Sequence, residues 1–435
     1  MEKNWKIGIN TFYQSISRFL VIIASVLTTA ILTRILGVSG YGNYVFLTSF
    51  LLVFVGLSDL GITSVAIREA SIDKPRSSKI FGSVFWCRLI VSLLLVFVLN
   101  ILIVNLPQFS DTRNEVAVGS LVILFLVIRT TVEAVFRSVL RMDWSASLEL
   151  IASFLFFFLL LFYYFFKIEL TLLSLVIFWV LSALISGLFG FLISFRFLSW
   201  DFKLDKKLSL KLIREALPLG LYLLIYAVYD KGIDSFMIKT FLNSEAVGYY
   251  GLAYKVHGNL ILLAAFLANS LFPVLSSLPL GSLELSKLYK KAFSFLLFTA
   301  FFIMAAVLLF SPFIVTFLAG NQYFASILVL RILAGATFFS FLNHLTGFFL
   351  IAKSKQSVLL KFSLLAFFVN LMLNLLLIPI WGINAAALVT ILTEALIFLL
   401  TYIYISKEFN LRLNIQDLHE CFLLMLKDKL HYFNK

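Results

Sequence analysis

Long hydrophobic stretches separated by short polar segments run along almost the whole chain. A transmembrane helix needs about 20 consecutive, predominantly apolar residues, and a window of about 19 residues finds twelve such stretches. They lie at residues 12–36, 44–66, 81–104, 116–137, 147–166, 171–195, 215–241, 247–274, 292–318, 327–351, 358–379 and 382–405. The pattern therefore predicts an all-α polytopic membrane protein with about twelve transmembrane helices.

The composition agrees with a protein that is mostly surrounded by lipid. Of the 435 residues, 62% are hydrophobic and 13% are charged, and the mean hydropathy is +1.04. Soluble domains contain roughly 45–50% apolar and about 25% charged residues. Twelve spans occupy about 58% of such a chain, which leaves little of it for a soluble domain.

Sequence motifs of enzymes and metal proteins are missing from the chain. It contains no Walker-type phosphate loop, no HExxH motif, no nucleophile elbow and no Cys/His spacing typical of metal sites. We therefore expect no catalytic residues, no bound metal and no cofactor. Any uphill work has to draw on an ion gradient or on the steps before and after transport.

Basic residues in the loops gather on one side of the predicted membrane. With a cytoplasmic N-terminus, most loop Lys and Arg residues lie in cytoplasmic segments, whereas Arg113 and Lys167 lie in the opposite loops. This bias predicts that both termini are cytoplasmic. It also accounts for most of the net charge of +13, so no nucleic-acid partner is needed to explain it.

A polar segment between the sixth and seventh spans divides the chain into two halves of six spans. The predicted parts are an N-lobe, a cytoplasmic linker, a C-lobe and a cytoplasmic tail, at residues 1–196, 197–212, 213–405 and 406–435. A weak internal repeat supports this division. The motifs Tyr41-Gly42-Asn43-Tyr44 and Val247-Gly248-Tyr249-Tyr250 each lie in the turn between the first two spans of their half. Two such halves are a common plan of membrane transporters.

Ionisable residues inside the spans mark candidate functional sites, since charges in a bilayer are costly. The deep basic residues are Arg18, Arg88, Arg129, Lys231 and Lys255, and the acidic ones are Asp59, Glu133, Asp230, Asp234 and Glu394. At 1.5 Å per residue, Arg18, Asp59 and Arg88 lie at a similar depth of roughly 10 Å. Asp59 therefore has two candidate partners, whereas Arg129 and Glu133 share a helix face and are expected to pair within one helix.

The remaining acids leave two hypotheses open. Asp230 and Asp234 share a helix face and raise each other's proton affinity, which suits a proton or sodium site. Lys231 or Lys255 can instead neutralise one of them, which makes the group structural. Glu394 lies near small residues that allow close helix contacts, so it either hydrogen-bonds across such a contact or takes part in transport.

Basic groups outnumber acidic groups in the predicted interior once the bases near the span ends are included. These further bases are Arg34, Lys239 and Arg331. Because a charge inside a membrane protein needs a partner, the excess favours an anionic ligand. We therefore expect Arg18, Arg88, Arg129, Lys231 and Lys255 to line a cationic cavity.

Several short motifs occur in an order that is typical of bacterial polysaccharide transporters. Those of the first half are Arg34-Ile35-Leu36-Gly37, Tyr41-Gly42-Asn43-Tyr44 and Asp59-Leu60-Gly61. Those of the second half are Tyr229-Asp230-Lys231-Gly232-Ile233-Asp234, Ala246-Val247-Gly248-Tyr249-Tyr250 and Trp381-Gly382-Ile383-Asn384-Ala385-Ala386-Ala387, which leads to Glu394. The chain resembles the O-antigen and lipid-linked oligosaccharide flippases, a branch of the multidrug/oligosaccharidyl-lipid/polysaccharide exporter superfamily.

This resemblance implies two six-helix lobes around a central cavity, as in multidrug and toxic-compound extrusion (MATE) proteins. It implies a substrate of a few sugars on undecaprenyl pyrophosphate, flipped across the bacterial inner membrane by alternating access and with H+ or Na+ as a possible coupling ion. It also carries over Asp59 and the Asp230–Asp234 region as candidate positions, although Lys231 between those acids argues against a plain cation site. Membrane lipids and other glycan-assembly membrane proteins are the expected partners.

Three alternatives remain at this point. The first is a MATE-like multidrug or cation antiporter of the same superfamily, whose site would favour acids without competing lysines. The second is a membrane glycan polymerase, which would need a larger external loop than the sequence contains. The third is a flippase for peptidoglycan precursors, a group that usually has more spans than this chain has room for.

Overall fold

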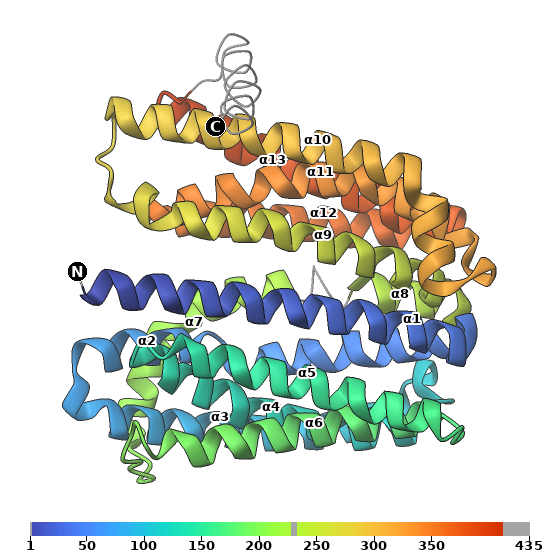
Figure 1. The fold of residues 1–435 in the computed structure, drawn as a ribbon, viewed down its shortest axis with the longest axis horizontal. Helices are drawn as coiled ribbons and strands as arrows, with labels where there is room; N and C mark the ends of the chain where they lie inside the picture. The colour runs from blue at the N-terminus through green and yellow to red at the C-terminus, as the bar shows by residue number, and fades with distance from the viewer. Residues whose placement is uncertain (1, 228–232, 412–435) are drawn as a thin grey trace, which may run out of the picture. The chain divides into compact units, whose positions relative to one another are not determined.

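The computed structural model describes residues 2–227 and 233–411, in which every regular element is a helix (Figure 1). The chain forms two compact units, Met1–Gly248 and Tyr249–Lys435. The elements up to the end of the first unit are α1 (Glu2–Asp59), α2 (Ile62–Ile72), η1 (Lys74–Arg76), α3 (Ser77–Asn105), η2 (Pro107–Phe109), α4 (Arg113–Ser138), α5 (Met142–Phe165), α6 (Leu172–Ser194), α7 (Lys206–Ala227), α8 (Ile233–Phe241) and the start of α9 (Ser244–Ser277). The second unit continues with α10 (Leu283–Ala319), η4 (Asn321–Tyr323), α11 (Ala325–Ala352), α12 (Gln356–Trp381) and α13 (Ile383–Glu408).

The helices confirm the prediction of an all-α polytopic membrane protein. Ten helical segments of the described chain are long and apolar enough to cross a bilayer. The predicted spans 12–36 and 44–66 are the two arms of α1, which bends at Gly37. The predicted span 215–241 corresponds to α7 and α8, which flank residues outside the described ranges, and each remaining span coincides with one helix.

The two turns that the internal repeat relates pack against each other. Gly37 bends α1 with a φ of 66°, a conformation that costs little only for glycine. A Cβ atom added to Gly42 would lie 1.7 Å from the carbonyl oxygen of Ser244, and one added to Gly248 would lie 2.2 Å from that of Val38. The contact is therefore reciprocal, as in a pair of surfaces related by a twofold axis.

The second arm of α1 ends earlier than the predicted span 44–66. Leu60 and Gly61 adopt positive φ angles of 41° and 75°, so the helix stops at Asp59 and α2 starts anew. A Cβ atom added to Gly220 of α7 would lie 2.0 Å from the carbonyl oxygen of Leu60. The break therefore coincides with a backbone contact to α7, which a count of apolar residues does not reveal.

The predicted linker 197–212 is folded against α3. The Nε1 atom of Trp86 donates a hydrogen bond to the carbonyl oxygen of Phe202 (2.6 Å), and a Cβ atom added to Gly82 would lie 1.7 Å from the carbonyl oxygen of Asp201. Helix α7 begins inside the predicted linker. The division into two six-span lobes at this segment stays a prediction, since the first compact unit continues through α7 and α8.

In the second unit, α11 packs against α10 and α13, and α12 packs against α13. Lys353 follows the end of α11, and its Nζ atom donates to the carbonyl oxygens of Leu275 and Leu278 (2.6 and 2.7 Å). It thereby satisfies acceptors at the C-terminal end of α9, as a basic residue does in a helix cap. Most of the predicted tail, from residue 412 onward, lies outside the described residues.

Candidate functional site

An ion pair between a buried arginine and a half-buried aspartate joins the end of α1 to α3. The Nη2 atom of Arg88 lies 3.4 Å from Oδ1 of Asp59, and the Arg88 side chain is 2% exposed. Thr63 of α2 donates a hydrogen bond to the same carboxylate oxygen. Asp59 reaches both partners because α1 ends at this residue and α2 turns back beside it. The predicted pairing of Asp59 with an arginine at its own depth is confirmed for Arg88.

Two threonines of α4 complete the surroundings of the Arg88 guanidinium. Its Nη1 atom donates to Oγ1 of Thr131 (2.7 Å), and its Nη2 atom donates to Oγ1 of Thr130 (2.9 Å). Each threonine hydroxyl donates in turn to a main-chain carbonyl one turn earlier in α4 (2.7 and 2.8 Å), so its lone pairs are left for the guanidinium. Arg88 thus ties α1, α3 and α4 together.

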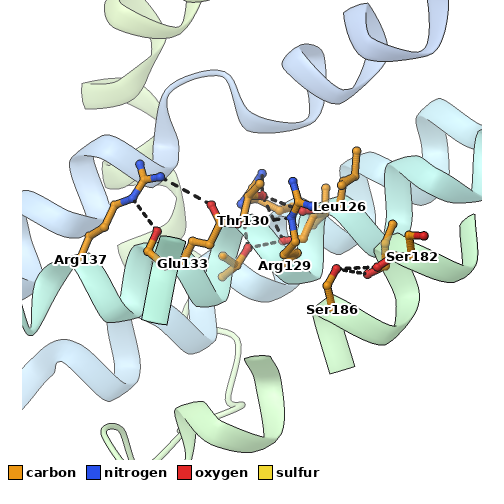
Figure 2. A network of polar contacts seen from close by, with 12 residues as sticks. Leu126, Arg129, Thr130, Glu133, Arg137, Ser182 and Ser186 are labelled. Carbon is orange, nitrogen blue, oxygen red and sulfur yellow. Dashed lines mark hydrogen bonds and ion pairs between the residues drawn. The ribbon is translucent and has the colours of Figure 1, made fainter. Parts of the chain in front are cut away.

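Glu133 of α4 lies between two arginines of the same helix (Figure 2). Its Oε1 atom is 3.3 Å from Nε of Arg129, and its Oε2 atom is 3.5 Å from Nη2 of Arg137. Successive members are four residues apart and therefore share a face. The residue Glu133 is 9% exposed, whereas the Arg137 side chain is 47% exposed. The predicted pair of Arg129 and Glu133 is confirmed, and Arg137 extends it toward the exposed end of α4.

The ion pairs of the network join three arginines to two carboxylates. Its basic members are Arg88, Arg129 and Arg137, and its acidic members are Asp59 and Glu133. A guanidinium has five N–H donors, and single contacts of 3.3 to 3.5 Å to one shared carboxylate leave most of them for other acceptors. Among the described residues, no cluster of three or more His, Cys, Asp or Glu side chains can hold a metal ion. The chemistry that this arrangement supports is the binding of an anion such as a phosphate.

Helix α6 comes close to α4 beside Arg129. A Cβ atom added to Gly187 would lie 3.2 Å from the carbonyl oxygen of Phe125 and 3.7 Å from Cβ of Arg129. One turn of α6 here carries Ser182 and Ser186, and the Ser186 hydroxyl donates to the carbonyl oxygen of Ser182 (2.6 Å; Figure 2). Small residues allow such close contacts between membrane helices. Helix α6 therefore packs directly against α4 at Arg129.

Glu394 of α13 is held by α11. The Nδ2 atom of Asn343 donates to Oε2 of Glu394 (2.8 Å) and to the main-chain oxygen of the same residue (2.9 Å). Ala385, Ala386 and Ala387 of α13 are fully buried. The predicted hydrogen bond of Glu394 across a helix contact is therefore confirmed.

Five further predicted site residues remain, and two of them lie outside the described residues. Arg18 of α1 and Lys255 of α9 are exposed, and Asp234 of α8 is buried. Asp230 and Lys231 lie outside the described residues. The ion-coupling role of the Asp230–Asp234 region, and its neutralisation by a lysine, therefore stay predictions.

Uncharged polar residues complete the site, and the sequence analysis did not select them. Thr130 and Thr131 bind Arg88, Thr63 binds Asp59, and Asn343 binds Glu394. Two signals were available for the threonines, because Thr130 and Thr131 follow Arg129 directly and Thr63 lies one helical turn after Asp59. No comparable signal marks Asn343, which reaches Glu394 only through the packing of α11 on α13.

Sequence relatives of the chain come from glycan biosynthesis. A family model described as "Polysaccharide biosynthesis protein" matches residues 7–279. The probable low-salt glycan biosynthesis flippase Agl15 of Haloferax volcanii is 25% identical over 224 residues, which cover 50% of this chain and 47% of that relative. The chain thus aligns with about half of the length of this curated relative.

Solved structures of membrane transporters share the fold. The lipid II flippase MurJ in an inward closed conformation gives a TM-score of 0.74 at 16% identity, over 95% of this chain and 92% of that chain. An inward-facing multidrug resistance transporter of the MATE family gives a TM-score of 0.66 at 14% identity, over 90% and 98% of the two chains. At this identity the similarity shows that the chain shares the fold of these transporters. The family model covers more than half of the chain, so the chain belongs to the polysaccharide biosynthesis protein family.

Proposed function

We propose that this protein is a flippase for oligosaccharide repeat units linked to undecaprenyl pyrophosphate, such as those of O-antigen or capsule, in the bacterial inner membrane. The family and the glycan flippase Agl15 support a lipid-linked glycan as the substrate. The observation that carries the proposal is the excess of arginines over carboxylates in the network around Arg88, Arg129 and Glu133. An interior with surplus guanidinium groups matches a pyrophosphate better than a cationic drug.

The physical problem of this substrate explains why an exporter needs interior cations. A pyrophosphate with attached sugars would lose its water partners in about 30 Å of hydrocarbon, whereas its polyprenyl tail is stable in lipid. Arg129 is the best candidate contact of the network because its partner Glu133 is shared with Arg137. Arg18, Lys231 and Lys255 are further candidates.

Arg88 has a different role in this proposal. Its guanidinium is enclosed by Asp59, Thr130 and Thr131, so it positions α1, α3 and α4 rather than contacting the substrate in this conformation. Alternating access then moves the pyrophosphate head while the tail stays in the bilayer.

The proposal extends to ion coupling and to orientation. The candidates for coupling to H+ or Na+ are the five acids of the predicted interior, Asp59, Glu133, Asp230, Asp234 and Glu394. The distribution of basic loop residues supports a cytoplasmic location of both termini. A cysteine in place of Lys203 should then react with a membrane-impermeant thiol reagent only from inside the cell, and one in place of Lys167 only from outside.

The test of the function is a chromosomal deletion that is complemented with variants. Arg129→Ala should abolish surface glycan and cause lipid-linked repeat units to accumulate, and Arg129→Lys should retain part of the activity because it keeps the charge. Loss of a charge-assisted hydrogen bond costs about 1.5–3 kcal/mol, which corresponds to at least about tenfold in substrate binding. Arg113→Ala, at the exposed start of α4, is the matched control and should behave as the wild type.

Two outcomes would contradict the proposal. Normal surface glycan in the deletion strain would exclude a flippase role. Normal glycan together with a new sensitivity to dyes or antibiotics would instead identify a multidrug antiporter.

A further inference from the structure

A shallow groove lies between α12 and α13 near the C-terminal end of α13. It has a volume of about 280 Å³ and is lined by Phe362, Leu400, Ile403, Tyr404, Lys407 and Glu408. The rings of Phe362 and Tyr404 meet edge to face across the two helices, with centroids 6.2 Å apart. Along α13, apolar side chains come first and charged ones follow about one turn later, so the groove has an apolar part and a charged end.

The charged end of the groove is positive overall. The Nζ atom of Lys355 lies 3.1 Å from Oε1 of Glu408, which neutralises that acid. Hydrogen bonds to the carboxylate of Glu408 and to Tyr404 raise the pKa of Lys355, so its amine stays protonated at neutral pH. Lys407 is exposed at the same end and adds a positive charge beyond this pair.

The apolar part of the groove continues into a surface that faces the hydrocarbon of a membrane. Leu365, Phe368, Met372 and Leu376 of α12 are all exposed, the last to 64%. Their spacing of three and four residues places them on one face, in line with Phe362. A hydrocarbon chain that leaves the groove therefore stays in contact with apolar side chains.

We propose that this groove binds a phospholipid with an anionic headgroup. The headgroup phosphate lies at Lys407, and one acyl chain lies on Phe362, Leu400 and Ile403. Basic pockets between transmembrane helices on the cytoplasmic side bind anionic headgroups, and this groove lies on the side that we propose to be cytoplasmic. Each lysine near the membrane surface strengthens the attraction to an anionic lipid about fivefold. A bulk phospholipid is the occupant because the groove lies within one helix pair, on a surface exposed to the bilayer. A lipid that binds only the folded protein also stabilises α12 against α13.

The test measures lipid binding to the purified full-length protein by native mass spectrometry. Titration with phosphatidylglycerol should give higher occupancy than titration with phosphatidylcholine. Lys407→Gln should lower the affinity for phosphatidylglycerol about fivefold and leave phosphatidylcholine unchanged. Ile403→Trp fills the apolar part and should lower the binding of both lipids. Lys287→Gln makes the same charge change at an exposed position of α10 and should have no effect.

Three outcomes would overturn the proposal. The first is equal occupancy by phosphatidylglycerol and phosphatidylcholine, and the second is an equal affinity of the Lys407 and Lys287 variants for phosphatidylglycerol. The third is displacement of phosphatidylglycerol by the same concentration of undecaprenyl phosphate, which would assign the groove to the carrier lipid. A thermal melt with phosphatidylglycerol controls for folding, since Ile403→Trp should melt normally without lipid and gain less from it. No transport is measured, so failure here and failure of the flippase proposal are distinguishable.

Discussion

Ion pairs cross between helices in both compact units, at the exposed pair Lys355–Glu408 in the second unit and at a buried arginine, Arg88, in the first. Ion pairs cross between elements of the first unit at Asp59–Arg88, Arg68–Glu215 and Lys79–Asp205 (3.4, 2.6 and 2.7 Å). Hydrogen bonds of uncharged side chains cross between helices of the second unit at His257–Thr337 and Thr346–Thr401 (2.8 and 3.0 Å). Removing one partner of a buried ion pair leaves an uncompensated charge, whereas a lost hydrogen bond between membrane helices costs about 0.6 kcal/mol on average. The first unit should therefore be the more sensitive to single substitutions.

Several glycines show a further difference between the two units, in how closely backbone segments approach each other. In the first unit, Gly42, Gly82 and Gly220 each lie so close to a backbone carbonyl that an added Cβ atom would overlap with it. In the second unit, an added Cβ atom at Gly258 would meet nothing within 4 Å, and one at Gly335 would lie 3.1 Å from the side chain of Ile391 rather than from backbone. Parts of the first unit are thus packed backbone against backbone.

The largest effect is expected at the ion pair of Asp59 and Arg88. Arg88→Met should destabilise the protein by about 3 kcal/mol, the lower end for a broken buried pair, because the Asp59 carboxylate that loses its partner is 26% exposed. The double variant Asp59→Leu with Arg88→Met should recover part of this loss, since an apolar pair of similar volume has no charge to desolvate. Thermal melting of the purified variants in detergent measures both effects.

The same variants separate the structural role of Arg88 from a role in substrate binding. If the double variant restores surface glycan, Arg88 acts only by positioning α1, α3 and α4. If it melts like the wild type and transport is still absent, Arg88 or Asp59 acts in transport itself and the purely structural assignment is wrong.

A smaller effect is expected from a pair of matched glycine substitutions. Gly42→Ala should destabilise by about 1–3 kcal/mol, because its Cβ atom would lie 1.7 Å from the carbonyl oxygen of Ser244 and the backbone has to move. Gly258→Ala should be neutral or stabilise by up to about 1 kcal/mol, because alanine has the higher helix propensity and the space is open. Equal melting temperatures of the two variants would contradict the difference between the units.

The features that the sequence predicted correctly depend on residues that are close together in the chain. The spans follow from runs of apolar residues, and the pair of Arg129 and Glu133 follows from helical spacing alone. The break at Leu60 and Gly61 was missed because it lies inside an apolar run and coincides with a contact to Gly220, a residue far away in the chain. The linker was predicted to be a simple connection because its polar composition does not show that its backbone packs on Gly82 of α3.

The same distinction holds for the candidate site. Depth in the membrane limited the partners of Asp59 to two arginines, but only tertiary packing selects Arg88 and adds Thr130 and Thr131. Glu394 was recognised as an acid inside a span, whereas its partner Asn343 depends on how α11 lies against α13. Charged candidates can thus be found from sequence, and their uncharged partners come from the fold.

In the second unit, substitutions of polar residues should have modest effects. Asn343→Leu removes the two hydrogen bonds to Glu394, and we expect a loss of about 0.6–1.7 kcal/mol, the range for hydrogen bonds between membrane helices. The melting temperature of this variant should lie between those of the wild type and Arg88→Met. A loss as large as that of Arg88→Met would show that the second unit also depends on a buried charge, and would remove the contrast between the units.

The smallest effect is expected at the exposed ion pair of Lys79 and Asp205. The hydrogen bond from Lys79 lowers the pKa of Asp205 below its ordinary value of 3.8. The contribution to stability is therefore fully present above this pH and is lost as the pH falls from 3.8 through the lower folded-state pKa. Asp205→Asn keeps a side-chain oxygen for the amide of Leu208, which Asp205 accepts at 3.0 Å at the start of α7, and removes only the charge. The melting temperatures of the wild type and the variant should differ slightly at pH 7 and converge below pH 3.8. A difference that persists in acid would show that the variant had lost the hydrogen bond from the amide of Leu208 rather than the ion pair.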